Sequence, residues 1–297
     1  MIINQTNLQA VYRGFRVLFL EALAATQPKW PQIATLIPSS TSQEEYRWLG
    51  RLPRMREWVG ERVVQNLSNA GFTIKNRDWE ATIEVDRNDI EDDTLGLYSS
   101  LIQAMGQAAA THPDELVFGL LAAGFTNPCY DGQYFFDTDH KDGDGPVQSN
   151  RGDKVLTAQS YADARAQMMS LLDERGNPMQ IMPDLLIVPP QLEKAGLEIL
   201  QADRLANGAT NIYRNSAQLL VSPYLASSPT AWYLVDTSKP IKPLIFQRRR
   251  DPQFVAKDRP DDDTVFMRKK FIYGTDSRDN AGYGLWQLAF GSTGTVA

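Results

Sequence analysis

Between Asp93 and Asp114 the chain carries no charged side chain if His112 is neutral, and this uncharged stretch constrains the fold more than any other feature. Acidic residues precede it, with Asp89 as an expected N-cap, so a helix is predicted from about Ile90 to Gly124. Pro113 predicts a kink or a restart within it. Apolar residues recur at spacings of three and four in two adjacent stripes. The first stripe is Leu95, Tyr98, Ile102, Met105 and Ala109, and the second is Leu97, Leu101, Ala104 and Ala108. Such a helix suits burial on two sides, as an internal support.

Composition narrows the class of protein. The 297 residues contain no low-complexity segment and no obvious linker, which favours interwoven lobes over separate domains. Cys129 is the only cysteine, so an internal disulfide is excluded. The formal net charge of -6 weighs weakly against a dedicated nucleic-acid binder. The longest apolar runs are too short for a membrane span, and no signal peptide is evident.

The first 85 residues contain two segments that need partner surfaces. An amphipathic helix is predicted after Thr6, an expected N-cap, and its apolar face docks either on its own core or on a neighbouring subunit. Residues 46–85 then mix tryptophan with arginine, and residues 82–86 alternate as a half-buried strand does. We interpret this segment as a two-stranded excursion, that is, two strands that extend away from the rest of the fold and return to the long helix. Tryptophan and arginine anchor protein interfaces, although they also stack on bases, and a solvated hairpin is the plainer alternative.

The second half of the chain is predicted to form a lobe that contains both helices and strands. Helices are expected at 157–175, capped by Thr157, and at 191–205, with strands at 184–190, 218–222 and 232–236. Strands at 267–275 and 283–290 are expected to form a terminal hairpin around a turn at 276–282 that covers the long helix.

Two clusters suggest competing functions. Asp137, Asp139 and His140 could form the acidic site of a metal-dependent enzyme, although the surrounding acidic residues do not have EF-hand spacing. Arg248, Arg249 and Arg250 could neutralise phosphates of a nucleic acid, but acidic residues nearby make ion pairs the better interpretation. The usual nucleotide-binding, serine-hydrolase and zinc-protease motifs are absent from the sequence. No catalytic residue, metal or cofactor is therefore predicted.

Five strings in a fixed order carry a family resemblance: IEVDRNDIEDD, YDGQYFFDTDH, DLLIVPPQLEKAGLEIL, AQLLVSPYL with WYLVD, and RDNAGYGLWQLAF. Together they resemble the major head subunit of Mu-like tailed bacteriophages, which is similar in fold to the Hong Kong 97 type of major capsid protein. The resemblance implies an α+β fold with five parts. These are an N-terminal arm at 1–45, an extended loop at 46–85, the spine helix of the peripheral domain at 86–124, an axial domain at 125–245, and a return to the peripheral domain at 246–297.

The function implied by this resemblance is that of a structural protein rather than an enzyme. Copies of the chain would assemble into hexamers and pentamers of an icosahedral head around double-stranded DNA, which they would contact without sequence specificity. The protein would reside in the virion capsid, and in the host cytoplasm during assembly, with no membrane partner. Further partners would be a portal, an optional decoration protein, and a scaffold or maturation protease. Any scaffold is expected to be a separate protein or already cleaved away, because the amphipathic start is short. Contacts between subunits are assigned to Trp48, Arg51, Arg54, Arg56, Trp58, Arg248, Arg249 and Arg250.

Overall fold

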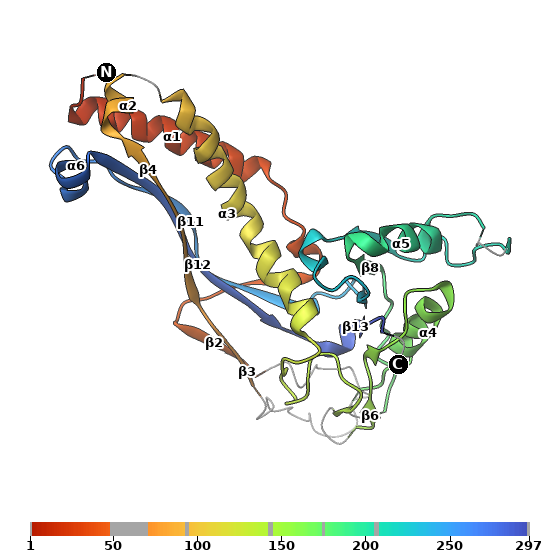
Figure 1. Cartoon of the computed structure of the whole chain (residues 1–297). Coiled ribbons are helices and arrows are strands. Elements are labelled where there is room, and N and C mark those ends of the chain that lie inside the picture. The colour runs from red at the N-terminus through yellow and green to blue at the C-terminus, as the bar shows by residue number, and fades with distance from the viewer. Residues whose placement is uncertain are drawn as a thin grey trace.

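The computed structural model describes residues 2–47, 71–92, 95–141, 145–173, 176–204 and 208–295. Two lobes are visible in Figure 1. The first is long and contains a four-stranded sheet together with helices, and the second contains a five-stranded sheet. Helix and strand occur in both lobes, as an α+β fold requires.

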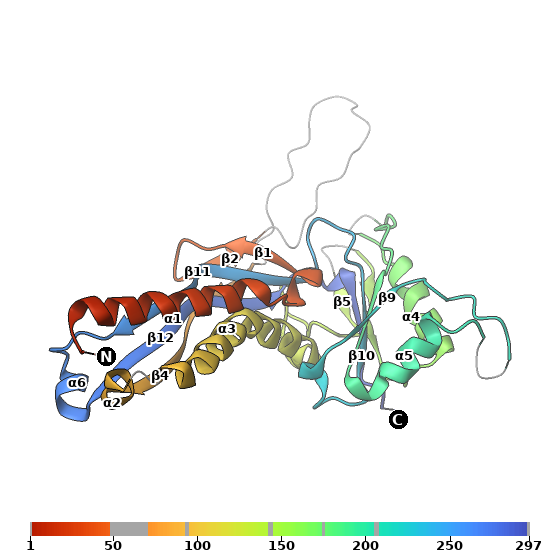
Figure 2. The same cartoon turned by 90° about the horizontal axis from the view of Figure 1, so that it is seen from above.

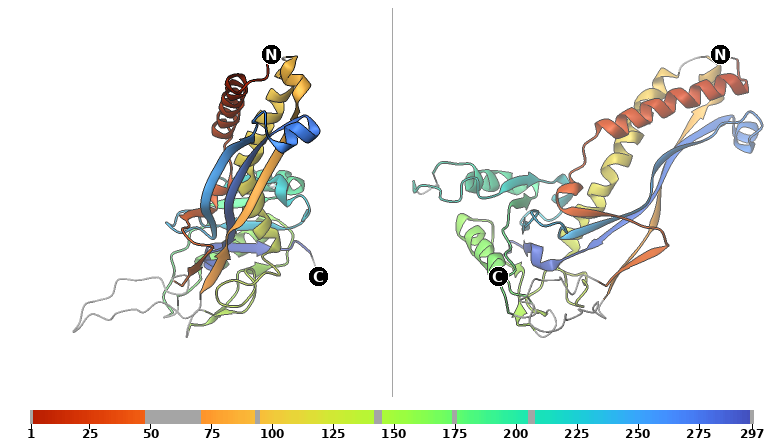
Figure 3. Two further views of the ribbon diagram at one scale, coloured as in Figure 1. Left: turned by 90° about the vertical axis from the view of Figure 1, so that its left-hand side faces the viewer. Right: turned by 180° about the vertical axis from the view of Figure 1, so that it is seen from behind.

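The first sheet has the strand order β1-β11-β12-β4. These strands are β1 (Ala34–Pro38), β4 (Arg77–Asp86), β11 (Leu244–Lys257) and β12 (Lys270–Tyr283). β1 is parallel to β11, whereas β11–β12 and β12–β4 are antiparallel. A short helix, α6 (Asp263–Arg268), connects β11 to β12 at the end of the first lobe farthest from the second lobe, as Figure 3 shows.

The turn predicted at 276–282 is wrong. Those residues continue β12, which pairs with β11 on one side and with β4 on the other. The residues that favour a turn serve contacts between strands instead. Asn280 Nδ2 donates to the carbonyl oxygen of Lys75 at 2.9 Å, and a Cβ at Gly282 would lie 2.5 Å from Ile74. Two neighbouring strands therefore override the local turn propensity.

Helix α1 (Gln5–Ala25) begins two positions earlier than expected, because Asn4 rather than Thr6 is its N-cap. Asn4 Oδ1 accepts from the Asn7 amide at 2.8 Å. Leu8, Val11, Phe15 and Phe19 are buried against the first lobe of the same chain. Of the two alternatives for this amphipathic face, the described structure therefore shows docking on its own core.

The predicted long helix is two helices. α2 (Arg87–Glu91) is capped by Asp86, whose Oδ1 accepts from the Asn88 amide at 2.9 Å, and α3 (Gly96–Ala123) follows. Asp89 is not an N-cap but lies within α2, where its carboxylate accepts from the Tyr98 hydroxyl. α3 runs through Pro113 without ending, and Figure 2 shows that it bends, so the kink alternative holds.

The second sheet has the strand order β7-β13-β10-β8-β9. Its strands are β7 (Arg151–Gly152), β8 (Leu185–Val188), β9 (Gln218–Val221), β10 (Trp232–Val235) and β13 (Ala289–Ser292). Helices α4 (Ala158–Met169) and α5 (Glu193–Leu200) lie in this lobe and end before the predicted positions 175 and 205. The predicted hairpin strand 283–290 is wrong. Residues 286–288 form a short 3-10 helix, η4 (Trp286–Leu288), and β13 joins the second sheet.

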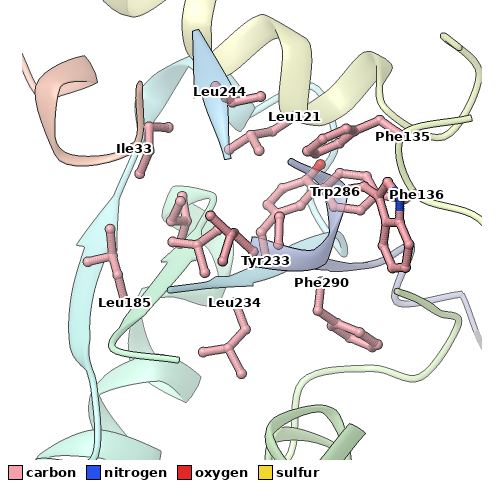
Figure 4. Close-up of a cluster of buried hydrophobic side chains, with 14 of the residues drawn as sticks. Ile33, Leu121, Phe135, Phe136, Leu185, Tyr233, Leu234, Leu244, Trp286 and Phe290 are labelled. Carbon is pink, nitrogen blue, oxygen red and sulfur yellow. The ribbon is translucent and has the colours of Figure 1, made fainter. Parts of the chain in front are cut away.

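One hydrophobic core connects the lobes. Figure 4 shows buried side chains from the first lobe, including Leu121 of α3 and Leu244 of β11, beside Tyr233 of β10 and Phe290 of β13. Trp286 lies between the sheets, because η4 links β12 to β13. The segment 246–297 thus contributes to both lobes.

The described chain also contains two antiparallel ribbons, and three short 3-10 helices at Trp30–Gln32, Pro190–Leu192 and Pro223–Leu225. β2 (Gln43–Tyr46) pairs with β3 (Phe72–Lys75) beside the first sheet, and β5 (His140–Lys141) pairs with β6 (Val147–Gln148) in the second lobe. The β2–β3 ribbon flanks residues 48–70, and its paired residues Tyr46 and Phe72 lie side by side.

Candidate assembly surfaces

Helix α3, which carries no Asp, Glu, Lys or Arg before Asp114, buries only one of its two apolar stripes within the chain. Ile102 and Met105 of the first stripe are buried, but Leu97 is 72% exposed and Leu101 is 50% exposed. Ala104 and Ala108 of the second stripe are exposed as well. The prediction that α3 is buried on two sides is therefore wrong for the single chain. A continuous apolar stripe on a helix surface is typical of an interaction site.

Large apolar side chains are also exposed at the far end of the first lobe. Phe266 and Met267 of α6 are 83% and 75% exposed. On the outer face of α1, Val17 and Leu20 are 53% and 43% exposed. These side chains lie on ordered helices, so they form defined apolar surfaces.

A buried polar network anchors the ribbon that flanks residues 48–70. The Tyr46 hydroxyl donates to Gln247 Oε1 at 2.7 Å, and Gln247 Nε2 donates to Asn76 Oδ1 at 2.7 Å. Asn76 Nδ2 in turn donates to Ser39 Oγ at 2.8 Å. Tyr46, Asn76 and Gln247 are all buried, so each of these polar groups needs its partner. Side chains from two strands, β2 and β11, and from two loops thus fix the β2–β3 ribbon to the first sheet.

Glu44 organises the turn beside this network. Its Oε1 accepts from the Ser40 amide at 2.9 Å, from Ser39 Oγ at 2.8 Å and from the amide and hydroxyl of Thr41. The Ser40 amide and the Ser39 hydroxyl are the main causes that lower the pKa of Glu44 from 4.5 to about 2, against the opposing effect of burial. The carboxylate therefore stabilises the turn at neutral pH.

Glu44→Gln is expected to lower the stability of the folded chain at pH 7, with a loss that disappears in acid. The folded-state pKa is depressed, so the contribution is present above about pH 4.5 and is lost as the pH falls through about 2. Chemical unfolding at pH 7 and pH 3 measures the difference. Glu45→Gln is the control, because the partner of Glu45 among the described residues is Arg47, at 2.8 Å on the surface. An equal loss at both pH values for Glu44→Gln would contradict this role.

The three arginines of β11 contact partners within the chain. Arg248 pairs with Asp251 at 2.9 Å, and its guanidinium lies 5.1 Å from the Phe246 ring centroid. Arg249 donates to the Ser39 carbonyl oxygen at 3.3 Å. Arg250 pairs with Asp276 and lies 3.9 Å from Asp78. Because Arg248 and Arg250 are paired with carboxylates, they are poorly available to bind phosphates, and the nucleic-acid alternative is not favoured. The other predicted contact residues, Trp48, Arg51, Arg54, Arg56 and Trp58, lie outside the described residues.

The structure does not bring together the predicted acidic site. His140 is fully buried and contacts Asp131 rather than Asp137 or Asp139: its Nδ1 lies 2.7 Å from Asp131 Oδ2. Asp139 is exposed and accepts from Gln133 at 3.2 Å. Asp137 instead accepts from two backbone amides, those of Tyr134 and Thr138. A metal site built from Asp137, Asp139 and His140 is therefore wrong.

Among the described residues, donor atoms of Cys129, Asp131 and His140 do lie within 4.8 Å of one another. Hydrogen bonds account for this grouping, because Cys129 Sγ donates to Asp131 Oδ1 at 3.1 Å and His140 uses the other carboxylate oxygen. Burial raises the pKa of Cys129 far above its ordinary value, so the side chain remains a thiol, whereas metal ligation requires a thiolate. Sequence reasoning missed this cluster, because the spacing of its residues matches no motif.

Comparison with known proteins assigns the family. The model of the Mu-like prophage major head subunit gpT matches residues 8–155, 147–225 and 226–297. The chain is 34% identical over 296 residues to the major capsid protein of Escherichia phage Mu, covering all of this chain and 76% of that protein. This chain belongs to the Mu-like major head subunit family. It is also 34% identical over 289 residues to the Mu-like prophage FluMu major head subunit of Haemophilus influenzae, covering 97% of this chain and 74% of that protein.

Solved structures agree with the family. The procapsid of bacteriophage JBD30 contains a chain with 37% identity and a TM-score of 0.64, which covers 99% of this chain and 77% of that one. The virus-like particle from Pyrococcus furiosus shares the fold at 10% identity, with a TM-score of 0.53 over 94% of this chain and 97% of that one. The chain is thus a major capsid protein with a Hong Kong 97-type fold, and its place is the phage head. Its relatives are structural proteins, so the enzyme alternative is not favoured. No helix in the described ranges is long and apolar enough to cross a membrane.

Proposed function

We propose that copies of this major capsid protein form the hexameric and pentameric capsomers of an icosahedral head around double-stranded DNA. One observation carries the proposal beyond family membership: α3 leaves the stripe Leu97, Leu101, Ala104 and Ala108 exposed on a helix without charged residues before Asp114. Such a stripe gains free energy when a neighbouring subunit covers it, at about 25 cal/mol for each Å² of apolar surface. The exposed side chains of α1 and α6 extend the same argument to other faces of the first lobe.

We assign the first lobe to the peripheral domain and the second lobe to the axial domain, with β13 as the part of segment 246–297 that belongs to the axial sheet. Residues 46–85 act as the extended loop, and Trp48, Arg51, Arg54, Arg56 and Trp58 contact the neighbouring copy. Arg248 and Arg250 contribute to the interface through their ion pairs, and Arg249 through its bond to the Ser39 carbonyl oxygen, so that charge is positioned at the base of the loop. Many modest contacts become mutually supporting when a shell closes.

Other partners follow from the same role. Packaged DNA contacts the shell without sequence specificity, and the net charge of -6 limits its adhesion. A separate scaffold or maturation protease and a portal complete assembly. A decoration protein is a further partner. The related JBD30 capsid, 33% identical over 68% of this chain, is described as decorated with minor capsid protein trimers.

Leu101→Glu tests the α3 stripe. The substitution is expected to leave the subunit folded, because Leu101 is half exposed in the single chain, but to reduce particle yield at least tenfold by burying a charge at the contact. Gln103→Glu is the matched control, since Gln103 is an exposed, uncharged residue of the same helix outside the stripe. Electron microscopy with circular dichroism measures both properties. Normal particles from Leu101→Glu would contradict the role of the stripe.

A further inference from the structure

A pocket of about 260 Å³ lies between α3 and the first sheet. Its lining comes from α3, β4, β11, β12 and the 3-10 helix η3 (Pro223–Leu225), beside the bend of α3 that Figure 2 shows. Glu80 and Glu115 are exposed and mark its open side, whereas Thr275 and Ser277 are buried and form its inner end. The pocket therefore leads from solvent to the buried face of β12.

Polar side chains interrupt the buried face of β12 at this pocket. Among the residues that alternate on this face, Tyr273 belongs to the core that buries α1, and Ala281 belongs to the core that connects the lobes. Thr275, Ser277 and Asp279 lie between them and are buried as well. The pocket is thus a polar gap between two separate apolar cores.

Some of the polar groups at the inner end are not used within the described residues. The Thr275 hydroxyl makes no hydrogen bond in this part of the chain, although the residue is only 6% exposed. His112 Nε2 and Asp279 Oδ1 lie 3.9 Å apart, which is beyond hydrogen-bond distance, and neither atom forms a hydrogen bond with another described residue. Buried polar groups normally have partners, and a ligand that donates hydrogen bonds would supply them to both oxygens.

The charges and rings of the lining favour a cation. The open side carries the carboxylates of Glu80 and Glu115, and none of the described lining residues is Lys or Arg. Neither carboxylate forms a salt bridge with a described Lys or Arg. Trp79 and Tyr224 add aromatic surface, and Trp79 is held in place because its Nε1 donates to the Asp279 carbonyl oxygen at 3.3 Å. Aromatic rings and carboxylates both attract guanidinium and ammonium groups.

Other classes of ligand fit this pocket less well. An anion would meet two carboxylates at the open side. A divalent metal ion needs several ligand atoms close together, and the described residues bring no three His, Cys, Asp or Glu donors together here. A fully apolar ligand would leave the buried Thr275 hydroxyl without a partner. Ala81, Ala109 and Pro252 nevertheless provide apolar lining for an aliphatic stem.

We propose that this pocket binds a guanidinium or primary ammonium group carried on a short aliphatic stem. The carboxylates of Glu80 and Glu115 balance its charge, and the Thr275 hydroxyl accepts one of its N–H groups. Two sources share this chemistry, a small free amine and an Arg or Lys side chain of a neighbouring copy. Ala108 belongs both to the lining and to the exposed stripe of α3, so a subunit that covers the stripe could reach the pocket.

NMR titration of the soluble, nitrogen-labelled full chain with n-butylguanidinium tests the site. The indole N–H signal of Trp79, assigned with the Trp79→Phe variant, reports binding at the pocket. n-Butylurea is the matched control ligand, because it has nearly the same shape and no charge, and we expect it to bind at least about tenfold more weakly. The measurement does not depend on whether shells form. Equal affinities, or no shift of the Trp79 signal with n-butylguanidinium, would overturn the proposal.

Charge-neutral variants test the two carboxylates. Glu80→Gln combined with Glu115→Gln is expected to weaken binding of n-butylguanidinium by about fivefold or more, with the chain still folded because both residues are exposed. Glu84→Gln is the matched control, since Glu84 is an exposed residue of β4 outside the lining. Unchanged affinity in the double variant would also overturn the proposal. If circular dichroism shows that the double variant is unfolded, the comparison of the two ligands on the unaltered chain decides alone.

Equilibrium dialysis of n-butylguanidinium against assembled particles distinguishes the two sources. If the natural ligand is a free amine, the particles bind the probe as the soluble chain does, and the double variant assembles normally. If the natural ligand is a side chain of a neighbouring copy, the particles exclude the probe, and the double variant assembles poorly. Either result supports a cation-binding pocket.

Discussion

A chain in which a two-residue turn replaces residues 48–70 is expected to fold and to form no closed shells. The flanking strands pair with each other from Gln43 opposite Lys75 to Tyr46 opposite Phe72, so a short turn can close them. The buried bonds of Tyr46 to Gln247 and of Gln247 to Asn76 also remain. The replaced segment carries the arginine and tryptophan side chains that we propose contact a neighbouring copy.

Thermal unfolding and electron microscopy measure the two parts of this prediction. A Gly/Ser segment of the same length at positions 48–70 is the control for chain length, and it should also fail to form shells, because it lacks the contact side chains. Shells of normal size and yield from either variant would contradict the role of the extended loop. If a variant does not fold, its failure to form shells would instead reflect an unstable subunit.

Gly106→Leu is expected to lower the free energy of unfolding by about 2–3 kcal/mol. A Cβ at this position would lie 2.6 Å from the Phe19 carbonyl oxygen and 2.9 Å from the Ala22 Cβ. The obstacle is largely the backbone of α1, so the two helices must separate. Separation exposes Phe15 and Phe19, which are buried between α1 and the first sheet.

Gly119→Leu is the matched control on the same helix. Nothing lies within 4 Å of a Cβ at Gly119, and that residue is exposed. Replacing glycine in a helix should then stabilise the chain by about 0.5–1 kcal/mol. Urea unfolding of the two variants gives the comparison, and equal effects would show that close approach at Gly106 is not needed for stability.

Helices and strands with a clear local signal, such as a capping residue or an apolar run, were predictable from the sequence. Thr157 begins α4 with a capping box, in which its hydroxyl accepts from the Ser160 amide at 3.1 Å. The apolar run before Pro189 forms β8, whose four residues are all buried and which lies between β10 and β9 in the second sheet. In both cases the local signal and the tertiary environment agree.

The errors arose where distant segments decide local structure. Asn280 and Gly282 favour a turn by themselves, but β4 and β11 on either side hold them in a strand. Helix α2 begins at Arg87 rather than near Ile90, because Asp86 at the end of β4 is its N-cap. The prediction that α3 is buried on two sides failed for a different reason, since Leu97 and Leu101 are exposed in the single chain. An apolar face predicts burial, but it does not tell whether the same chain or another copy covers it.

The candidate surfaces were predicted only in part. Tryptophan and arginine marked the segment after Tyr46, but the anchoring of its base by Gln247 could not be read from residues about 200 positions apart. The acidic cluster was misassigned for the same reason: His140 pairs with Asp131 rather than with the nearer Asp139. Contacts of this kind depend on the path of the loop, which composition does not specify.

The most direct measurement is sedimentation velocity of the purified full chain over a range of concentrations, with electron microscopy of each fraction. A capsid subunit with exposed apolar side chains on α1, α3 and α6 is expected to form rings, tubes or closed particles as its concentration rises. A folded chain that sediments as a monomer at every concentration, with or without a scaffold, would contradict assembly through these surfaces.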